Sequence, residues 1–543
     1  MKPKNKLESQ DNQIREEEAI LNENEATCFQ SEFESAEVGL TTLTAERLRA
    51  IAENATQQFY NYDSMQWLAC LIQRNFSYIE SLRRWAKISG VRGSISKLTK
   101  IGEGSTDGFV YNASLHGIED LILLKTPKEY WRDVNISHEF FIAAMFTNGL
   151  RRWIPNFMFI YGLFKCSRPN FVNPNDKTTS TFCTHTRVSD LRSVLSEPEK
   201  RKLDAREKLI NLYINQKRYN ESEEYIAQIE DLHREYDVEM DVPVNYLVIE
   251  NIPGGLTLER HINDNEPAFT EILGYFVQLA MALDVALNVF DFCHYDLHAS
   301  NIMMRDLYDE DNLTFIPIQY SDSDGSIPEI AEYFLQTEYI ATIIDYGRSH
   351  VRWYDFDSKT TKHFGDHLSN VEKTGVYPDR SRPAHDLYKF VGSTVYEIFY
   401  KYRLPIPYDF DSRGKTDDEI RSQIMAYNIP DDLFDDLVRV LSFFPFFKES
   451  FGEAINDESL KAPAIEFILQ EREGPGLMSI GDKWAAADTW PFKMNLHKMF
   501  FQHLKTVLPE EVGQILFLGK DLPTDAVIYS CEFNDCQPPP PAI

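Results

Sequence analysis

The sequence lacks several features that would have placed the chain in particular classes of protein. It has seven cysteines among 543 residues, scattered and without a CxxC pair. This pattern indicates a reducing compartment and no disulfide framework. We find no signal peptide at the start of the sequence and no apolar run of transmembrane length. We therefore expect an intracellular, cytoplasmic protein with no membrane partner.

Basic residues are scarce relative to acidic ones. Lys and Arg together number 55 against 85 Asp and Glu, which leaves a formal net charge of −30 at pH 7. Such a charge disfavours non-specific binding to nucleic acid or to an anionic membrane. We expect no direct nucleic-acid binding, although a local basic patch is compatible with this charge. The 43% of hydrophobic residues is enough for large cores.

What the sequence does contain is a pair of polar motifs that each follow an apolar segment. The first is 294–301 (HYDLHASN), after a long helical run, and the second is 345–347 (DYG), after a strand-like run. Phosphoryl transfer needs a carboxylate that orients the attacking hydroxyl and accepts its proton, and further oxygen ligands that hold magnesium. The two motifs in this order predict Asp296 as the base and Asn301 and Asp345 as the magnesium ligands.

These motifs resemble the catalytic loop and the metal-binding turn of the protein-kinase-like superfamily, whose usual forms are HRDLxxxN and DFG. His298 replaces the usual Lys, a variant that resembles haspin-type kinases and aminoglycoside and choline phosphotransferases. Segments 138–141 and 154–157 resemble serine/threonine protein kinases of large DNA viruses. The resemblance covers about residues 96–450, with gaps. It implies an α+β, bilobal fold with a small antiparallel β lobe and a mainly helical large lobe.

The resemblance also assigns residues upstream of the catalytic loop. Segment 101–110 (IGEGSTDGFV) resembles the glycine-rich loop that covers ATP phosphates, with one extra residue before its third glycine. The nucleotide contacts expected there are Gly102, Gly104, Ser105, Gly108 and Val110. Lys125 ends an apolar strand and would reach the α and β phosphates. Glu139, in a helical pattern fourteen residues on, would pair with Lys125.

Segment 246–255 resembles the hinge between the two lobes. In the family, Ile249 would be the gatekeeper, and the backbone at Glu250 and Ile252 would bond the adenine. An ordinary buried strand and turn would explain the same residues if the other motifs were missing. Asp386 opens a helical run after a proline, so it fits both a helix cap and the family's buried aspartate that holds the catalytic loop.

Composition and periodicity divide the chain into regions. We expect a disordered acidic tail at 1–40, a helical extension at 41–95, a small lobe at 96–252 with a helical insert at about 187–240, a large lobe at 253–470, and a helical extension with a Pro-rich tail at 471–543. Residues 307–338 lengthen the segment between the two motifs and contain acidic turns.

Residues 348–384 should form the activation segment. No Ala-Pro-Glu motif ends it, which leaves the peptide-docking surface and the substrate class open. Tyr295 takes the place of an Arg that in many protein kinases pairs with a phosphate on this segment. We therefore expect activity that does not require phosphorylation of the segment.

The expected activity is that of an ATP- and Mg²⁺-dependent serine/threonine protein kinase acting on protein hydroxyls, in the host cell or virion if the chain is viral. A small-molecule phosphotransferase is the first alternative, supported by His298 and the absent Ala-Pro-Glu. A catalytically silent scaffold is the second, disfavoured because all five catalytic positions are chemically intact. The charge of His298, at a position expected to contact the transferring phosphate, is open because His titrates near neutral pH, and so is the oligomeric state.

Overall fold

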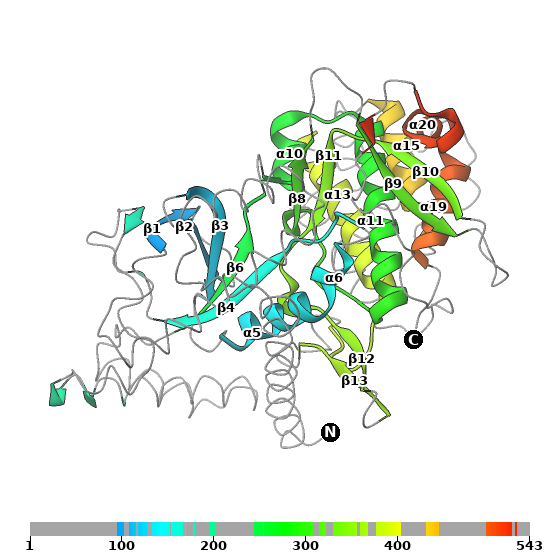
Figure 1. Ribbon diagram of the computed structural model, residues 1–543. Coiled ribbons are helices and arrows are strands. Elements are labelled where there is room, and N and C mark those ends of the chain that lie inside the picture. Colours follow the sequence, from blue (N-terminus) through cyan, green and yellow to red (C-terminus); the bar gives the residue numbers. More distant parts are fainter. Residues whose placement is uncertain are drawn as a thin grey trace, which may run out of the picture. The chain divides into compact units, whose positions relative to one another are not determined.

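The computed structural model describes about half of the chain, in two compact units. The described residues are 95–101, 108–115, 118–127, 133–151, 154–166, 169, 177–179, 196–198, 200–201, 204, 244–252, 255–307, 314–321, 330–355, 359–366, 376–402, 430–444, 496–523 and 527–528. Unit 1 comprises Met1–Arg152, Met158–Asn251 and Asp366–Leu368, and unit 2 comprises Trp153–Phe157, Ile252–Gly365 and Ser369–Ile543. Both mix helices with mainly antiparallel sheets (Figure 1), although β15 (Val527–Ile528) pairs with β9 (Thr314–Ser321) in parallel in one sheet of unit 2. The expected tail at 1–40, nearly all of the extension at 41–95 and most of the 187–240 insert lie outside the described residues.

Unit 1 is built on a six-stranded sheet of order β4-β6-β3-β2-β1-β5, antiparallel throughout. Its strands are β1 (Ile95–Ile101), β2 (Gly108–Leu115), β3 (Ile118–Pro127), β4 (Ile160–Cys166), β5 (Thr178–Thr179) and β6 (Val244–Glu250). Helix α5 (Asp133–Ile142) packs along β3, β4 and β6 (Figure 1). The apolar side chains of Ile122 and Leu124 on β3 and Phe141 on α5 are fully buried. Burial of this apolar surface is what fixes the helix on the sheet.

A buried polar cluster joins the helical segment to the strands of unit 1. Asn148, in the short helix α6 (Asn148–Leu150), donates to the Ile160 carbonyl at 2.8 Å and accepts from the Ile160 amide at 3.0 Å. Arg151 Nη1 lies 2.8 Å from Glu250 Oε1, and both side chains are almost completely buried. The same carboxylate oxygen accepts the amide of Phe159 at 2.9 Å. Glu250 therefore carries a structural charge pair at the end of β6.

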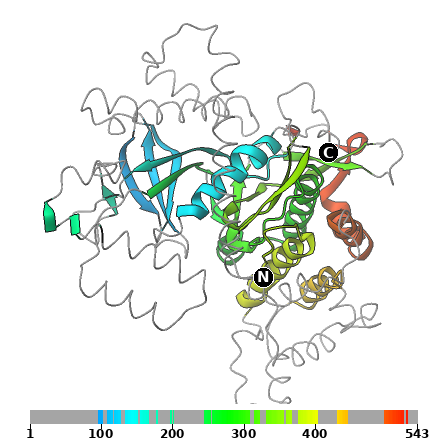
Figure 2. The same ribbon diagram turned by 90° about the horizontal axis from the view of Figure 1, so that it is seen from below.

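Unit 2 is organised around the 22-residue helix α11 (Phe269–Phe290). Its other helices, within the described residues, are α10 (Leu258–Asn265), α13 (Pro383–Lys401), α15 (Asp431–Leu441), α19 (Leu496–Val507) and α20 (Pro509–Ile515). Helices α13, α19 and α20 pack on α11, and Figure 2 shows the orange-red α19 beside it. By length and composition α11 could cross a membrane, which corrects the expectation that no apolar run is long enough. However, 83% of its most apolar window is buried by the rest of the chain, as in a core helix, so this is weak evidence for a span.

Three small sheets complete the part of unit 2 that the structure describes. They have the orders β11-β8-β7, β14-β10-β9-β15 and β12-β13, with strands β7 (Leu256–Thr257), β8 (Ile302–Asp306), β9 (Thr314–Ser321), β10 (Ile330–Gln336), β11 (Tyr339–Ile343), β12 (Val351–Asp355), β13 (Thr360–Phe364), β14 (Leu516–Leu518) and β15 (Val527–Ile528). The region expected to hold acidic turns thus also contains the paired strands β9 and β10. Strand β14, from the C-terminal region, extends this pair.

A buried amide network holds β11 against α11. The Asn156 carboxamide donates to Gln278 Oε1 at 3.2 Å and to the Ala341 carbonyl at 2.9 Å. Gln278 in turn donates to the Tyr339 carbonyl at 3.0 Å and accepts from the Ala341 amide at 3.0 Å. Because buried amides are costly to leave unpaired, this network fixes the strand that leads into Asp345.

The buried charge pair of unit 1 yields a stability prediction. We expect Glu250→Ala to destabilise unit 1 by about 3–5 kcal/mol, because it leaves the buried Arg151 uncompensated. The double variant Arg151→Met/Glu250→Leu should recover most of that loss, since it removes both charges while keeping volume. Chemical denaturation followed by circular dichroism measures both. As a control, Lys200→Met breaks an exposed pair with Glu197 and should have little effect. A Glu250→Ala variant as stable as this control would contradict the prediction.

Candidate functional site

The motif 294–301 begins just after α11, and a side chain from α13 holds its first residues. Asp386, 1% exposed, accepts the His294 amide on Oδ2 at 2.5 Å and the Tyr295 amide on Oδ1 at 2.7 Å. Of the two roles expected for Asp386, the structure shows the loop-holding one. The helix-cap role is wrong, because α13 begins at Pro383 with Arg382 as its N-cap and without a side-chain cap. The proline explains this, since it supplies a helical φ and has no amide that needs a partner.

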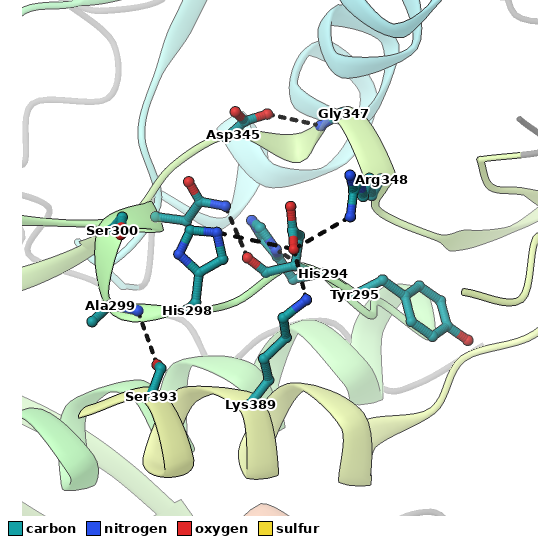
Figure 3. Close-up of polar contacts among 12 residues, drawn as sticks. His294, Tyr295, His298, Ala299, Ser300, Asp345, Gly347, Arg348, Lys389 and Ser393 are labelled. Carbon is teal, nitrogen blue, oxygen red and sulfur yellow. Dashed lines mark hydrogen bonds and ion pairs between the residues drawn. The ribbon is translucent and has the colours of Figure 1, made fainter. Parts of the chain in front are cut away.

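Two side chains tie the loop to the residue that precedes Asp345. His294 accepts the Asp296 amide on Nδ1 at 3.2 Å and lies with Nε2 2.9 Å from the Ile344 carbonyl. A carbonyl can only accept, so Nε2 carries the proton and the tautomer is fixed. The side-chain amide of Asn301 donates to the Asp296 carbonyl at 2.8 Å. The backbone carbonyl of Asn301 accepts the Ile344 amide at 3.0 Å. Both motifs of the sequence therefore belong to one bonded assembly (Figure 3).

Asp296 lies beside two cationic side chains and one imidazole. Its Oδ1 accepts from Lys389 Nζ at 2.7 Å and lies 3.5 Å from Arg348 Nη1 and 4.0 Å from His298 Nε2. Figure 3 shows Lys389 reaching from α13 to the loop. Burial acts to raise the pKa of Asp296, but the charges of Lys389 and Arg348, together with the hydrogen bond from Lys389, outweigh it and hold the pKa well below its usual range. The carboxylate is ionised at neutral pH.

His298 has the opposite balance. Burial lowers the pKa of its imidazole, with the nearby Lys389 acting in the same direction and Asp296 opposing them. The lowered pKa favours the neutral form of the ring at neutral pH. The fixed positive charge next to Asp296 comes from Lys389 and Arg348 instead.

Sequence reasoning missed these two cations in this role. Lys389 lies three residues after Asp386 on α13, and residues at that spacing share one face of a helix. Arg348 ends the 3₁₀ turn η5 (Tyr346–Arg348) directly after Asp345. The signal for Lys389 was available in the helical spacing, but only once Asp386 was known to face the loop.

Asp345 lies in the left-handed region, with φ of 65°, and its carboxylate accepts the Gly347 amide at 3.4 Å. The following Tyr346 is fully buried and donates its hydroxyl to the Ile343 carbonyl at 3.0 Å. Its ring packs beside Phe157 and Phe292. The turn at Asp345 is thus anchored by the aromatic side chain that follows it.

The donor set of Asn301 and Asp345 fits magnesium. Magnesium takes oxygen ligands, commonly one or two carboxylates completed by phosphate oxygens and waters. The Asn301 side-chain nitrogen is committed to the Asp296 carbonyl, so the carboxamide oxygen is the atom that faces away from this bond. The pair therefore offers one amide oxygen and one carboxylate, both on backbone that the loop contacts hold in place.

In unit 1 the structure places Lys125 and Glu139 in an ion pair. Nζ of Lys125 lies 2.8 Å from Glu139 Oε2, and the two residues are 6% and 1% exposed. Val110 on β2 lies opposite Lys125 in the sheet register. Gly108 starts β2 where an added Cβ would stand 2.5 Å from the Thr126 carbonyl oxygen, so only glycine fits. Gly102, Gly104 and Ser105 lie outside the described residues.

The expected hinge residues have structural partners at the end of β6. Ile249 is buried, and the Glu250 amide donates to the Phe159 carbonyl at 3.0 Å. That amide is therefore engaged within unit 1, while the Glu250 side chain pairs with Arg151. Ile252 is also buried, and its carbonyl accepts the Gly255 amide at 3.1 Å in the turn that follows. The contact of Glu250 and Ile252 with adenine stays a prediction.

Tyr295, at the position of the missing Arg, is fully buried in a left-handed conformation with φ of 62°. Its hydroxyl donates to the Arg380 carbonyl at 2.5 Å, and burial raises its pKa well above the ordinary value. The expected activation segment contains the hairpin β12–β13 and residues 376–382, while 367–375 lie outside the described residues. Tyr295 thus bonds this segment directly through a neutral hydroxyl.

The Asp386 contacts predict a specific loss of order. We expect Asp386→Ala to free the amides of His294 and Tyr295, so that both exchange hydrogen much faster. Two bonds to a charged acceptor are lost, at about 1.5–3 kcal/mol each. Hydrogen exchange read by mass spectrometry on peptides spanning 292–297 measures the effect. The exposed Asp379→Ala is the matched control, and exchange in Asp386→Ala equal to this control would contradict the assignment.

Comparison with known proteins gives a distant similarity to a viral protein. No family model matches the chain. The protein named Probable kinase 098L, of Invertebrate iridescent virus 3, is 25% identical over 144 residues, which cover 26% of this chain and 24% of that protein. The aligned part thus spans about a quarter of the relative's length. This distant similarity supports a kinase-like function and leaves the type of substrate unspecified.

Proposed function

We propose that the chain transfers the γ-phosphoryl group of ATP to serine and threonine hydroxyls of proteins. The observation that carries the proposal is the half-buried, ionised Asp296 in a loop that contains Asn301 and that is hydrogen-bonded to Ile344, the residue before Asp345. The distant similarity to a viral protein named as a probable kinase supports the same class of activity. Phosphoryl transfer relies on positioning and charge neutralisation more than on covalent chemistry, and this is what the residues offer.

Each group has one role in the proposed reaction. The substrate hydroxyl attacks the γ-phosphorus, the bond to the β-phosphate oxygen breaks, and the hydroxyl proton passes to Asp296 while ADP leaves. Magnesium, held by Asn301 and Asp345, would neutralise charge on the phosphates. Lys125 would bind the α and β phosphates, with Glu139 fixing its side chain. Because the transition state is loose, a weakly basic Asp296 suffices to orient the hydroxyl.

Lys389 supports this proposal from an unexpected position. Protein kinases usually carry a cation two residues after the catalytic aspartate, where this chain has the neutral His298. Lys389 donates to Asp296 from α13 instead. We assign to Lys389 the positive charge that faces the transferring phosphoryl group.

A small-molecule phosphotransferase is the second candidate. His298 and the absent Ala-Pro-Glu favour it. Transfer of radiolabelled phosphate from ATP to the protein itself, to generic proteins and to a metabolite panel separates the two. Label on metabolites alone would replace the protein-kinase proposal, and label on none would favour the silent scaffold.

The roles of the carboxylates and of Lys125 are tested by isosteric substitution. Asp296→Asn and Asp345→Asn should each lower the transfer rate by about 100-fold or more, because an amide neither accepts the proton nor binds metal as an anion. Lys125→Met should do the same by removing the phosphate cation. Exposed Asp379→Asn is the control and should keep wild-type turnover. Near-normal rates in the first two variants, with no rise in melting temperature of the wild type on saturation with ATP-Mg, would refute the site.

The cationic surroundings of Asp296 predict a pH effect. Asp296 has a lowered pKa, so its ionised form persists far below neutral pH in the wild type. Lys389→Met removes the closest cation, so the pKa of Asp296 should rise. As the pH is lowered, the variant should therefore lose activity at a higher pH than the wild type does. The pH profile of kcat/KM measures this shift, and Lys389→Arg should restore the wild-type profile. An unchanged acid limb in Lys389→Met would show that Lys389 does not control the protonation of Asp296.

A further inference from the structure

Three potential metal-ligating side chains meet in unit 2 at a point that the phosphoryl-transfer chemistry does not use. Asp291 follows α11, His350 precedes β12, and His363 lies on β13. Their ligand atoms all lie within 4.8 Å of one another. Among the residues that the structure describes, this is the group of His and carboxylate side chains whose spacing suits a metal ion. Figure 1 shows the β12–β13 hairpin near the lower end of α11.

The two imidazoles have the spacing of ligands on a common ion. His350 Nε2 lies 3.1 Å from His363 Nδ1, and the rings are stacked with a 23° interplanar angle. Two nitrogens on one tetrahedral zinc, each about 2.0–2.1 Å from the metal, are about 3.3 Å apart. The observed separation therefore needs only a small adjustment for both nitrogens to bind one ion.

The groups behind these ligands also resemble those of metal sites. His350 Nδ1 lies 3.3 Å from the Asp291 carbonyl, so a proton on Nδ1 leaves the Nε2 lone pair toward His363. Metal-binding histidines commonly donate a hydrogen bond to a carbonyl in this way, from the N–H of the ring nitrogen that does not bind the metal. Ser381 donates its hydroxyl to Asp291 Oδ1 at 2.6 Å, which orients the carboxylate. His350 is fully buried while His363 is exposed, so an ion can enter from the solvent side.

We propose that Asp291, His350 and His363 bind a divalent transition metal of the zinc class, with a fourth position for water or an external ligand. Two imidazoles and one carboxylate suit zinc, whereas magnesium prefers oxygen ligands. This site is therefore chemically separate from the pair Asn301 and Asp345.

The proposed ion would join two parts of unit 2. It would link the end of α11 to the β12–β13 hairpin, which lies in sequence between Asp345 and α13. His350 also exchanges two backbone hydrogen bonds with Cys293, at 3.0 and 2.8 Å, next to the catalytic loop. Binding would hold the ends of the β12–β13 hairpin that carry His350 and His363 close to that loop, without a phosphate.

The test measures zinc directly on the full chain, purified without a histidine tag. The protein is dialysed against micromolar zinc and then against zinc-free buffer, and retained metal is counted by mass spectrometry. We expect about one zinc per chain in the wild type and in Asp345→Asn, with a higher melting temperature in its presence. His363→Ala and Asp291→Asn should each bind at least about tenfold more weakly. Exposed Thr361→Ala, two residues along the same strand, is the matched control.

Both test variants are chosen to fold. His363 is exposed, and Asn tolerates the left-handed φ of 53° at Asp291, so metal-free melting temperatures should match the wild type. Cobalt substitution adds a spectroscopic readout, since four-coordinate cobalt absorbs visible light far more strongly than six-coordinate cobalt. No retained zinc in the wild type would overturn the proposal. So would unchanged affinity in His363→Ala and Asp291→Asn, or loss of zinc in Asp345→Asn, which would place the ion on the magnesium-type ligands.

Discussion

One buried carboxylate, Asp386, holds two successive peptide amides, and the geometry of the candidate site in unit 2 depends on it. A left-handed residue lets neighbouring amides converge on an anion, and Tyr295 supplies that conformation. The loop is then fixed at its start by α13, at Asp296 by the side chain of His294, and at its end by the bond between Asn301 and Ile344. Asp296 is oriented by the loop backbone before any ligand binds, which is the preorganisation that electrostatic catalysis requires.

The charges around Asp296 show why neighbours in sequence are a poor guide to a local field. His298 is two residues away and is neutral, whereas Lys389 is 93 residues away and touches the carboxylate. Burial disfavours the charged form of each group in this region, so the carboxylate of Asp296 stays ionised because cations on other elements, Lys389 and Arg348, lie next to it. The buried pair Arg151–Glu250 in unit 1 follows the same rule, with its carboxylate also bonded to a backbone amide.

The local parts of the candidate site could be predicted from the sequence. The order of strand lysine and helix glutamate indicated the pairing of Lys125 with Glu139, and the two motifs indicated the loop and turn around Asp296 and Asp345. Antiparallel sheets mixed with helices were also expected. The function of these residues stays a prediction, and the glycine-rich loop largely lies outside the described residues.

The remaining features depend on contacts between distant segments. The side-chain role of Glu250 and the meeting of Asp291 with His350 and His363 leave no local periodicity to read, and the helical spacing of Lys389 is informative only once Asp386 is known to face the loop. The same holds for β14 joining β10, because a three-residue strand gives no alternating pattern long enough to recognise. The apolar run of α11 was underestimated because isolated polar residues such as Gln278 interrupt it, although Gln278 is satisfied inside the core by β11.

The pairing of Tyr333 on β10 with Leu518 on β14 also bears on how unit 2 is made. Contacts between residues so far apart along the chain raise the contact order, and they form slowly because a long loop must close first. During synthesis β10 emerges long before β14 and α19, and until they arrive one side of β10 is an open strand edge that invites pairing with other chains. Unit 2 therefore reaches its full sheet only after translation of its last described strands, and the nascent chain depends on protection of that edge until then.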